Sequence, residues 1–277
     1  MRSPELIRAL ALSCHPIPSL AVTAISAGLA ALAGLPIGRG ALVTGAVFTG
    51  QLSIGWSNDY LDAGRDRAVR RTDKPVATGA LKPRVVGMAA VAAFISTIAL
   101  SAALGWPGGA AALATVVSAW AYNLGLKATA LSWLPYALSF GVLPAVASLS
   151  ASPARWPAAW AMIAGALLGV AAHLANVLPD LGDDAATGIR GLPHRIGGRA
   201  TALAAAAALL AASAAILFGP IGQPGLWRWA TFATATLLAG AATRLAYRDP
   251  SSRRFFLVII LIAALDVVSF AFAGIRL

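Results

Sequence analysis

Long apolar runs are the feature of this 277-residue sequence that most limits the folds open to it. An α-helix needs roughly 20 mainly apolar residues to cross the hydrocarbon core of a bilayer. Nine such runs, bounded by charged residues, Pro or Gly, predict nine transmembrane helices at 17–35, 40–58, 84–104, 107–124, 131–150, 157–178, 200–219, 226–246 and 254–275. The sequence therefore predicts an all-α integral membrane protein.

The composition supports an integral membrane protein and excludes other classes of protein. Hydrophobic residues make up 59% of the chain and charged residues 11%, which excludes an ordinary soluble domain. The single cysteine, Cys14, cannot form an internal disulfide, and Arg8 interrupts the short apolar run that lipidation of this cysteine would need. Because no linker rich in Pro or Ser divides the chain, we expect one transmembrane domain over 1–277.

The net charge of +11 is divided unevenly between the two predicted membrane faces. With nine helices, successive loops alternate between the faces, and one face collects every Lys and Arg except Arg39, Arg155, Arg228 and Arg276. By the positive-inside rule this face is cytoplasmic, which places the N-terminus inside and the C-terminus outside. The basic balance is thus assigned to topology and membrane lipid, and nucleic acid is not expected as a partner.

Carboxylates gather after the second predicted helix, in NDYLDAGRDRAVRRTDKP (58–75). Asn58, Asp62 and Asp66 recur at every fourth position, so they share one face of a helix, with Asp59 beside them. Asp73 falls off this face and is interpreted as part of a loop. Like charges stacked in this way destabilise a helix, so a cation is expected to compensate them.

A second motif, NVLPDLGDDAATGIRGLPHRIG (176–197), follows the sixth predicted helix on the same predicted face. Asn176, Asp180 and Asp184 repeat the spacing of the first motif. Two clusters of hard oxygen ligands suit Mg²⁺, which binds through a few carboxylates and substrate phosphate, whereas Zn²⁺ prefers Cys and His ligands. The alternative for either motif alone is a solvated helix end whose aspartates pair with neighbouring arginines.

Basic side chains follow both motifs. Some are expected to hold the loops at anionic lipid headgroups. Others suit a diphosphate, because Arg matches phosphate with two parallel hydrogen bonds and neutralises charge on a departing group. The candidate diphosphate contacts here are Arg65, Arg71, Lys74 and Arg190. Mg²⁺, arginine and a membrane location together indicate an amphiphilic phosphorylated substrate.

NDYLDAGRD with the following RTDKPVATG, and NVLPDLGDDAATGIRGLPHRIG, resemble the two aspartate-rich signatures of the UbiA superfamily of intramembrane prenyltransferases. The resemblance covers nearly the whole chain, since the helix number and the motif positions after the second and sixth helices also fit. It implies helices around a central cavity, and Mg²⁺ ions that bridge a prenyl diphosphate donor. The residues that it assigns to these ions are Asn58, Asp62, Asp66, Asn176, Asp180 and Asp184.

The same resemblance implies further roles. YNLGLK after the fourth predicted helix resembles the family's Tyr/Lys element, which places Tyr122 and Lys127 near the acceptor and the diphosphate. CHP, at 14–16, stands where the family usually has Arg-Pro, so no acceptor contact is assigned there. Asp59 either joins the metal ligands or activates the acceptor. The catalytic candidates are therefore Asp59, Asp62, Asp180 and Tyr122.

The expected reaction is Mg²⁺-assisted departure of diphosphate from an allylic carbon, followed by capture of the cation by a small hydrophobic acceptor, an aromatic molecule resembling a quinone precursor. A UbiA-type terpene cyclase, which would close the same donor on itself, and phosphoribosyl transfer to polyprenyl phosphate are the alternatives. A transporter or lipid-binding protein would place its acids near the bilayer midplane. Here all ten acids except Asp266 lie at predicted helix ends on one face.

Several other polar and aromatic side chains are less informative. Asp266, inside the last predicted helix, is expected to make a structural hydrogen bond to another helix. His173 is expected to pack between helices. Trp56 and Tyr60 either line the prenyl tunnel or mark the membrane interface. The remaining histidines, His15 and His194, receive no role.

Overall fold

The computed structural model describes residues 3–249 and 253–272, and all regular secondary structure in these two ranges is helical. The α-helices are α1 (Ser3–Ser13), α2 (Pro16–Leu32), α3 (Ile37–Ala68), α4 (Pro83–Leu104), α5 (Gly108–Leu124), α6 (Leu134–Ser148), α7 (Ala159–Val177), α8 (Leu181–Ala186), α9 (Leu192–Ile196), α10 (Gly198–Phe218), α11 (Leu226–Arg248) and α12 (Arg253–Phe272). Two 3₁₀ turns, η1 (Leu126–Ala128) and η2 (Leu178–Asp180), follow α5 and α7. The predicted all-α class is confirmed.

Each predicted transmembrane run coincides with one long helix, α2 to α7 or α10 to α12. The largest difference is α3, which continues to Ala68 instead of ending near 58 and carries the first carboxylate motif on its last turns. Three short helices were not predicted, because α1, α8 and α9 have only 11, 6 and 5 residues and show no long apolar run.

Within residues 3–249 and 253–272, three helical segments are long and apolar enough to cross a membrane by themselves: α4, the run Ala159–Ala186 and α10. α1 and α2 would form a fourth span as a pair, although they meet at an angle of 69°. The predicted count of nine spans is therefore not confirmed. Helix length explains part of the difference, because α6 has only 15 residues. The charged motif on the last turns of α3 explains another part.

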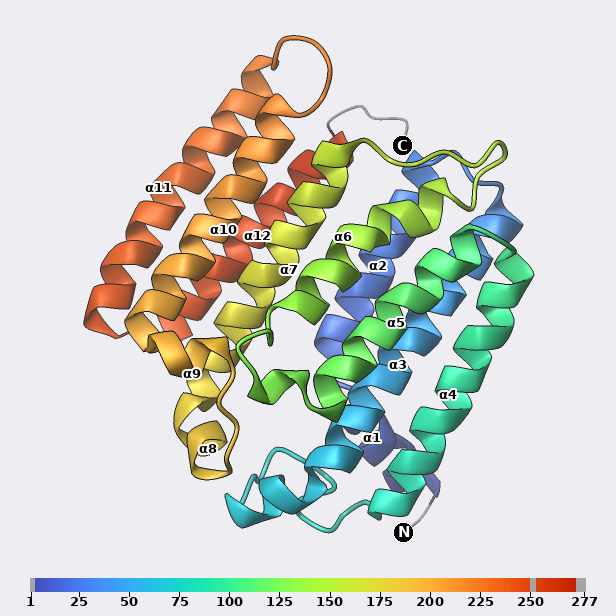
Figure 1. Ribbon diagram of the computed structural model, residues 1–277, viewed down its shortest axis with the longest axis vertical. Helices are drawn as coiled ribbons and strands as arrows, with labels where there is room; N and C mark the ends of the chain where they lie inside the picture. Colours follow the sequence, from blue (N-terminus) through green and yellow to red (C-terminus); the bar gives the residue numbers. More distant parts are fainter. Residues whose placement is uncertain (1–2, 250–252, 273–277) are drawn as a thin grey trace.

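The long helices run side by side, with α10, α11 and α12 grouped beside α7, and α2 to α6 on its other side (Figure 1). α1, α8, α9 and the loop 69–82 lie together at one end of this bundle, and the loops after α6 and α10 lie at the other (Figure 1). The C-terminal ends of α3 and α7 point to the first of these ends. Motifs far apart in the sequence are thereby brought to one place.

Three glycines allow α6 and α7 to approach closely. Gly165 and Gly169 lie about one turn apart on α7, and a side chain at either would collide with a carbonyl oxygen of α6, that of Phe140 or of Tyr136 respectively. Gly141 lies opposite on α6, where an added side chain would come within 3.1 Å of the Ala166 Cβ and 3.2 Å of the Met162 carbonyl oxygen. Small residues at this spacing let membrane helices pack backbone to backbone. The contact fixes α7, and with it the second motif, against the rest of the bundle.

We expect Gly169→Ala to destabilise the protein by about 1–3 kcal/mol, because the added methyl group meets the Tyr136 carbonyl oxygen and forces the two helices apart. Gly28→Ala is the matched control, since Gly28 lies inside α2 with open space around it and should gain helix propensity instead. The midpoint of thermal unfolding in one detergent measures both variants. Equal midpoints would contradict this account of the α6–α7 contact.

Candidate active site

A cavity of about 570 Å³ lies inside the bundle. Along α3 it is lined from Val47 through Ile54 to Asp66, a rise of about 28 Å at 1.5 Å per residue. Apart from Gln51, the lining along this path changes from apolar to polar. Helices α6, α10 and α12 complete the apolar part with Phe140, Leu143, Leu209, Ile259 and Ala263. One end of the cavity therefore suits a charged group, and the rest suits a hydrocarbon chain.

Both carboxylate motifs line the polar end of this cavity. The first contributes Asn58, Asp62 and Asp66 from one continuous helix, α3. The second contributes Asn176 from α7, Asp180 from η2 and Asp184 from α8. The second motif is therefore divided among three segments, although its spacing matches that of the first.

Most of the other predicted site residues line the same cavity, namely Arg65, Arg71, Lys74, Tyr122 and Lys127. Two do not. Asp59 is outside the lining of this cavity, and its carboxylate meets His15, which does line it. Arg190 is exposed in the loop after α8 and is also absent from the lining. The structure therefore does not bring Arg190 to the polar end of the cavity.

The carboxylate of Asp62 is bound by two cations. The Lys127 ammonium lies 2.6 Å from Oδ1 and 2.7 Å from Oδ2, and the Arg65 guanidinium donates to Oδ1 from one turn away on α3. Burial, together with repulsion from Arg65, lowers the pKa of Lys127 to about 7. The positive charge of Lys127 thus depends on the anions around it. The side chains of Lys127 and Arg65 can therefore exchange their hydrogen bonds to Asp62 for hydrogen bonds to the oxygens of a bound phosphate.

Lys74 is the second lysine that contacts the first motif. Its ammonium donates to Asp59 Oδ1 at 2.7 Å and to Asn58 Oδ1 at 3.4 Å. It lies 3.6 Å from Asp66 Oδ2, a buried atom without a hydrogen-bond partner. One lysine therefore contacts three of the four polar positions of the motif.

Arg71 joins the two motifs. Its guanidinium donates to Asp180 Oδ1 at 3.1 Å and to both oxygens of Asp73, at 2.8 and 2.9 Å. The hydrogen bonds from Arg71 lower the pKa of Asp73 to about 2, so this carboxylate stays charged. Asp73, expected to be a simple loop residue, therefore orients the arginine that reaches the second motif.

Asn123 is a site residue that the sequence did not single out. Its amide donates to the Ile54 carbonyl at 3.0 Å and to Ser57 Oγ at 2.8 Å, and its oxygen accepts a bond of 3.3 Å from Asn58. Asn58 in turn donates to Asp62 at 3.2 Å. Asn123 thus fixes the first motif to α5. Its position beside Tyr122 in YNLGLK was the signal that could have identified it.

Aromatic rings cluster near the polar end. The Tyr122 ring meets Tyr136 edge-on at 5.3 Å between centroids and His173 at 5.6 Å. His173 is buried, outside the cavity lining, and its Nε2 lies 3.0 Å from Ser132 Oγ, as expected for a packing histidine. The other predicted aromatics, Trp56 and Tyr60, do not line the cavity.

Asp266 and His194 each lie close to another polar side chain. Asp266 accepts a hydrogen bond of 2.6 Å from Ser213 of α10, which is the interhelical bond expected from the sequence. His194, to which no role was given, lies with Nε2 3.7 Å from Asp184 Oδ2. Burial lowers the pKa of His194, which disfavours its charged form. At this distance Nε2 makes no hydrogen bond to Asp184, and both ring nitrogens of His194 are buried without a hydrogen-bond partner.

The residues at the polar end do not form a complete metal site by themselves, but they provide part of the oxygen ligands that a hard divalent cation needs. Within the described residues, no three His, Cys, Asp or Glu side chains are grouped closely enough to hold a metal by themselves. The donor set is nevertheless one of carboxylate and amide oxygens, and Asp66 Oδ2 is buried without a hydrogen-bond partner. Mg²⁺ typically takes one or two carboxylates and completes its shell with water and phosphate oxygens. The site fits such an ion.

Sequence comparison defines the class of this protein. The UbiA prenyltransferase family matches residues 19–265, so the chain belongs to this family of enzymes. No curated protein matches the sequence.

Solved structures share the fold. A structure of digeranylgeranylglyceryl phosphate synthase superposes with a TM-score of 0.72 at 16% identity, covering 99% of this chain and 100% of that one. A UbiA homologue from Archaeoglobus fulgidus, bound to GPP and Mg²⁺, gives 0.71 at 15% identity and covers 97% and 100%. A homologue from Aeropyrum pernix K1 gives 0.71 at 16% identity and covers 90% and 95%. The predicted UbiA-like fold is confirmed.

Arg71→Ala should release the loop 69–82 from the second motif, because it removes the bonds to Asp180 and Asp73 together. We expect amide hydrogen exchange in this loop to become about ten-fold faster. Arg70→Ala is the control, since Arg70 is an exposed neighbour outside the cavity lining. Unchanged exchange in Arg71→Ala would show that this tie does not order the loop.

Proposed function

We propose that this protein transfers a prenyl group from a prenyl diphosphate to a small hydrophobic acceptor in an Mg²⁺-dependent reaction that releases diphosphate. The observation that carries the proposal is one cavity in which two carboxylate motifs and four cations meet at one end and mainly apolar side chains line the remainder. An amphiphile with a charged head and a hydrocarbon tail matches this division. The bound GPP and Mg²⁺ of the Archaeoglobus homologue support the same class of donor.

Each part of the cavity then has a role. The six residues that would hold Mg²⁺ are Asn58, Asp62, Asp66, Asn176, Asp180 and Asp184. When bound, Mg²⁺ neutralises the diphosphate and favours its departure. Four cations of this chain, Arg65, Arg71, Lys74 and Lys127, supply hydrogen bonds to the diphosphate oxygens. The apolar lining excludes water from the allylic cation, and the ring of Tyr122 offers it a π-face.

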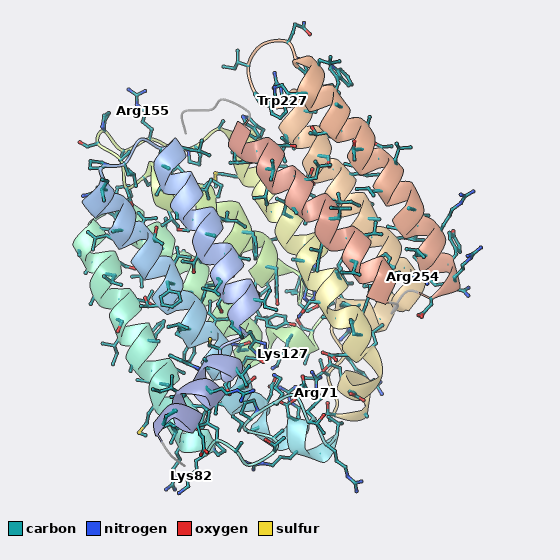
Figure 2. All side chains as sticks on the ribbon, turned by 180° about the vertical axis from the view of Figure 1, so that it is seen from behind. Arg71, Lys82, Lys127, Arg155, Trp227 and Arg254 are labelled. Carbon is teal, nitrogen blue, oxygen red and sulfur yellow. The ribbon has the colours of Figure 1, made fainter. Side chains whose placement is uncertain are left out.

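We propose that the polar end of the bundle faces the cytoplasm. Arg71, Lys82 and Lys127 lie toward this end, whereas Arg155 lies at the opposite one (Figure 2). This distribution agrees with the excess of Lys and Arg that the sequence assigns to one face. The N-terminus then lies inside and the C-terminus outside, and the donor's diphosphate reaches the site from the cytoplasm.

Asp62→Asn and Asp180→Asn should each lower kcat/KM for diphosphate release by about 100-fold or more, because each removes a charged oxygen ligand from one motif. Asp183→Asn is the matched control, since Asp183 is exposed, adjacent to the second motif and outside the cavity lining. The assay combines purified protein, a prenyl diphosphate and Mg²⁺, and chelation of the metal should stop turnover of the wild type.

The products of this assay separate the proposed reaction from its alternatives. Prenylated acceptor formed only when acceptor is added supports transfer. A cyclic hydrocarbon formed without acceptor would identify a terpene cyclase, and reaction with a phosphoribosyl donor instead would identify phosphoribosyl transfer. Full Mg²⁺-dependent turnover by Asp62→Asn or Asp180→Asn would refute the two-motif site.

Ala263→Phe should shorten the prenyl chain that the enzyme accepts. Ala263 lines the apolar part of the cavity from α12, so an aromatic ring there would occupy space needed by the tail. We expect the preference for a 20-carbon over a 10-carbon diphosphate, as the ratio of kcat/KM values, to fall about ten-fold. Ala264→Phe is the control, because the neighbouring Ala264 is exposed on the outside of the bundle. Equal ratios in the two variants would exclude this path for the tail.

A further inference from the structure

A second, smaller cavity of about 240 Å³ opens where α1 meets α2. Leu12, Ile17 and three prolines give it apolar walls, and its polar groups are His15, Asp59, Asp73 and Lys74. His15, Asp73 and Lys74 also line the larger cavity. The two cavities are therefore neighbours, with Lys74 at their boundary.

His15 and Asp59 form a pair in this smaller cavity. The distance from His15 Nε2 to Asp59 Oδ1 is 3.1 Å. The Asp59 side chain is 1% exposed, whereas that of His15 is 40% exposed. In the tautomer that donates its Nε2–H to Asp59, the other ring nitrogen, Nδ1, carries a free lone pair. A buried carboxylate thus orients an accessible imidazole, the arrangement of a general base and the group that positions it.

The backbone is built to hold His15 in this place. His15 has φ 53°, a left-handed conformation that costs free energy in a residue other than Gly, and it lies at the 69° break between α1 and α2. A side chain at Gly55 would collide with the Cys14 carbonyl, so only glycine lets the break rest on α3 one turn before Asp59. Trp56 of α3 holds α1 in place, because its Nε1 donates a hydrogen bond of 2.9 Å to the Leu10 carbonyl.

The charges in this cavity select against an anion. Two carboxylates, those of Asp59 and Asp73, face it. Lys74, the ammonium in its lining, is already bound to Asp59 at 2.7 Å. Asp73 is in turn bound to Arg71, so neither carboxylate is unpaired, but the lining holds two carboxylates and one cation and offers a ligand carboxylate no unpaired positive charge. An uncharged ligand with a hydroxyl group suits the apolar walls and the lone pair of His15.

We propose that the smaller cavity binds the acceptor, that the acceptor is an uncharged phenol or alcohol, and that His15 is the base that takes its hydroxyl proton. Asp59 is the positioning residue for His15. The hydroxyl proton passes to Nδ1, and the hydroxyl oxygen forms a bond to the allylic carbon. The carbon–oxygen bond of the donor breaks, and its electron pair leaves with the diphosphate. This inference rests on the proposed prenyl transfer, and His15 precedes the residues that the family matches.

His15→Asn and His15→Gly test the base. Asn and Gly both tolerate the left-handed backbone, so each should keep the fold, but neither can take up a proton at neutral pH. We expect kcat/KM for the acceptor to fall about 100-fold in each, with hydroquinone and geraniol as probes and geranyl diphosphate as donor. The dissociation constant of geranyl diphosphate with Mg²⁺ should change by less than about two-fold. Added imidazole should restore transfer in His15→Gly.

Two comparisons complete the test. Arg70→Gly is the matched control, because Arg70 also has a positive φ, 56°, and lies outside both cavities; its transfer rate should match the wild type. Asp59→Asn in the His15→Gly background should abolish rescue by imidazole, which a purely structural role would not do.

Failure of this inference is distinguishable from failure of the proposed function. Absence of Mg²⁺-dependent binding of geranyl diphosphate to the wild type would refute the proposed function. With that binding intact, the inference is overturned by transfer in His15→Asn at nearly the wild-type rate or by absence of imidazole rescue. Preference of the wild type for 4-hydroxybenzoate over hydroquinone, or no transfer to either uncharged probe, would overturn the acceptor class.

Discussion

Compensation of buried charge is the constraint on which this site depends. The Asp62 and Lys127 side chains are 15% and 8% exposed, at the end of a bundle whose surroundings are otherwise apolar. Removing each charge from water costs several kcal/mol, which only partners in direct contact can offset. The structure meets this condition with Lys127 and Arg65 on Asp62 and with Lys74 on Asp59, while Arg71 pairs with Asp180, whose side chain is 41% exposed. Without these pairs the buried carboxylates of Asp59 and Asp62 would carry uncompensated charge.

The same pairs hold the architecture together. Lys127 ties the turn after α5 to α3, and Arg71 ties the loop 69–82 to η2. The groups proposed to bind diphosphate are therefore also the groups that connect the helices. When a ligand binds these cations, the carboxylates lose their positive partners and need another one. A divalent ion can supply that positive charge. Substrate and metal are thus expected to bind together because neither alone preserves the charge balance.

Local patterns predicted what depends on neighbours in the sequence. The apolar runs located every long helix, and the four-residue spacing of Asn58, Asp62 and Asp66 placed them on one face of α3. Contacts between distant segments were not predictable in this way. Asn123 meets Asn58 across 65 residues and His15 meets Asp59 across 44, and neither partner shows a repeating pattern. The span count also exceeded what helix length and composition support, because apolar runs were counted without regard to the charged end of α3 or to the shortness of α6.

The order of these partners along the chain has a consequence for biosynthesis. As synthesis proceeds from the N-terminus, Asp62 emerges together with Arg65, three residues later, but before Lys127, which follows it by 65 residues. Asp180 emerges 109 residues after its partner Arg71. The first motif can therefore be neutralised locally while α3 enters the membrane, whereas closure of the complete site must wait for the second half of the bundle. A chain interrupted after α6 would retain a charged first motif without the segment that completes the cavity.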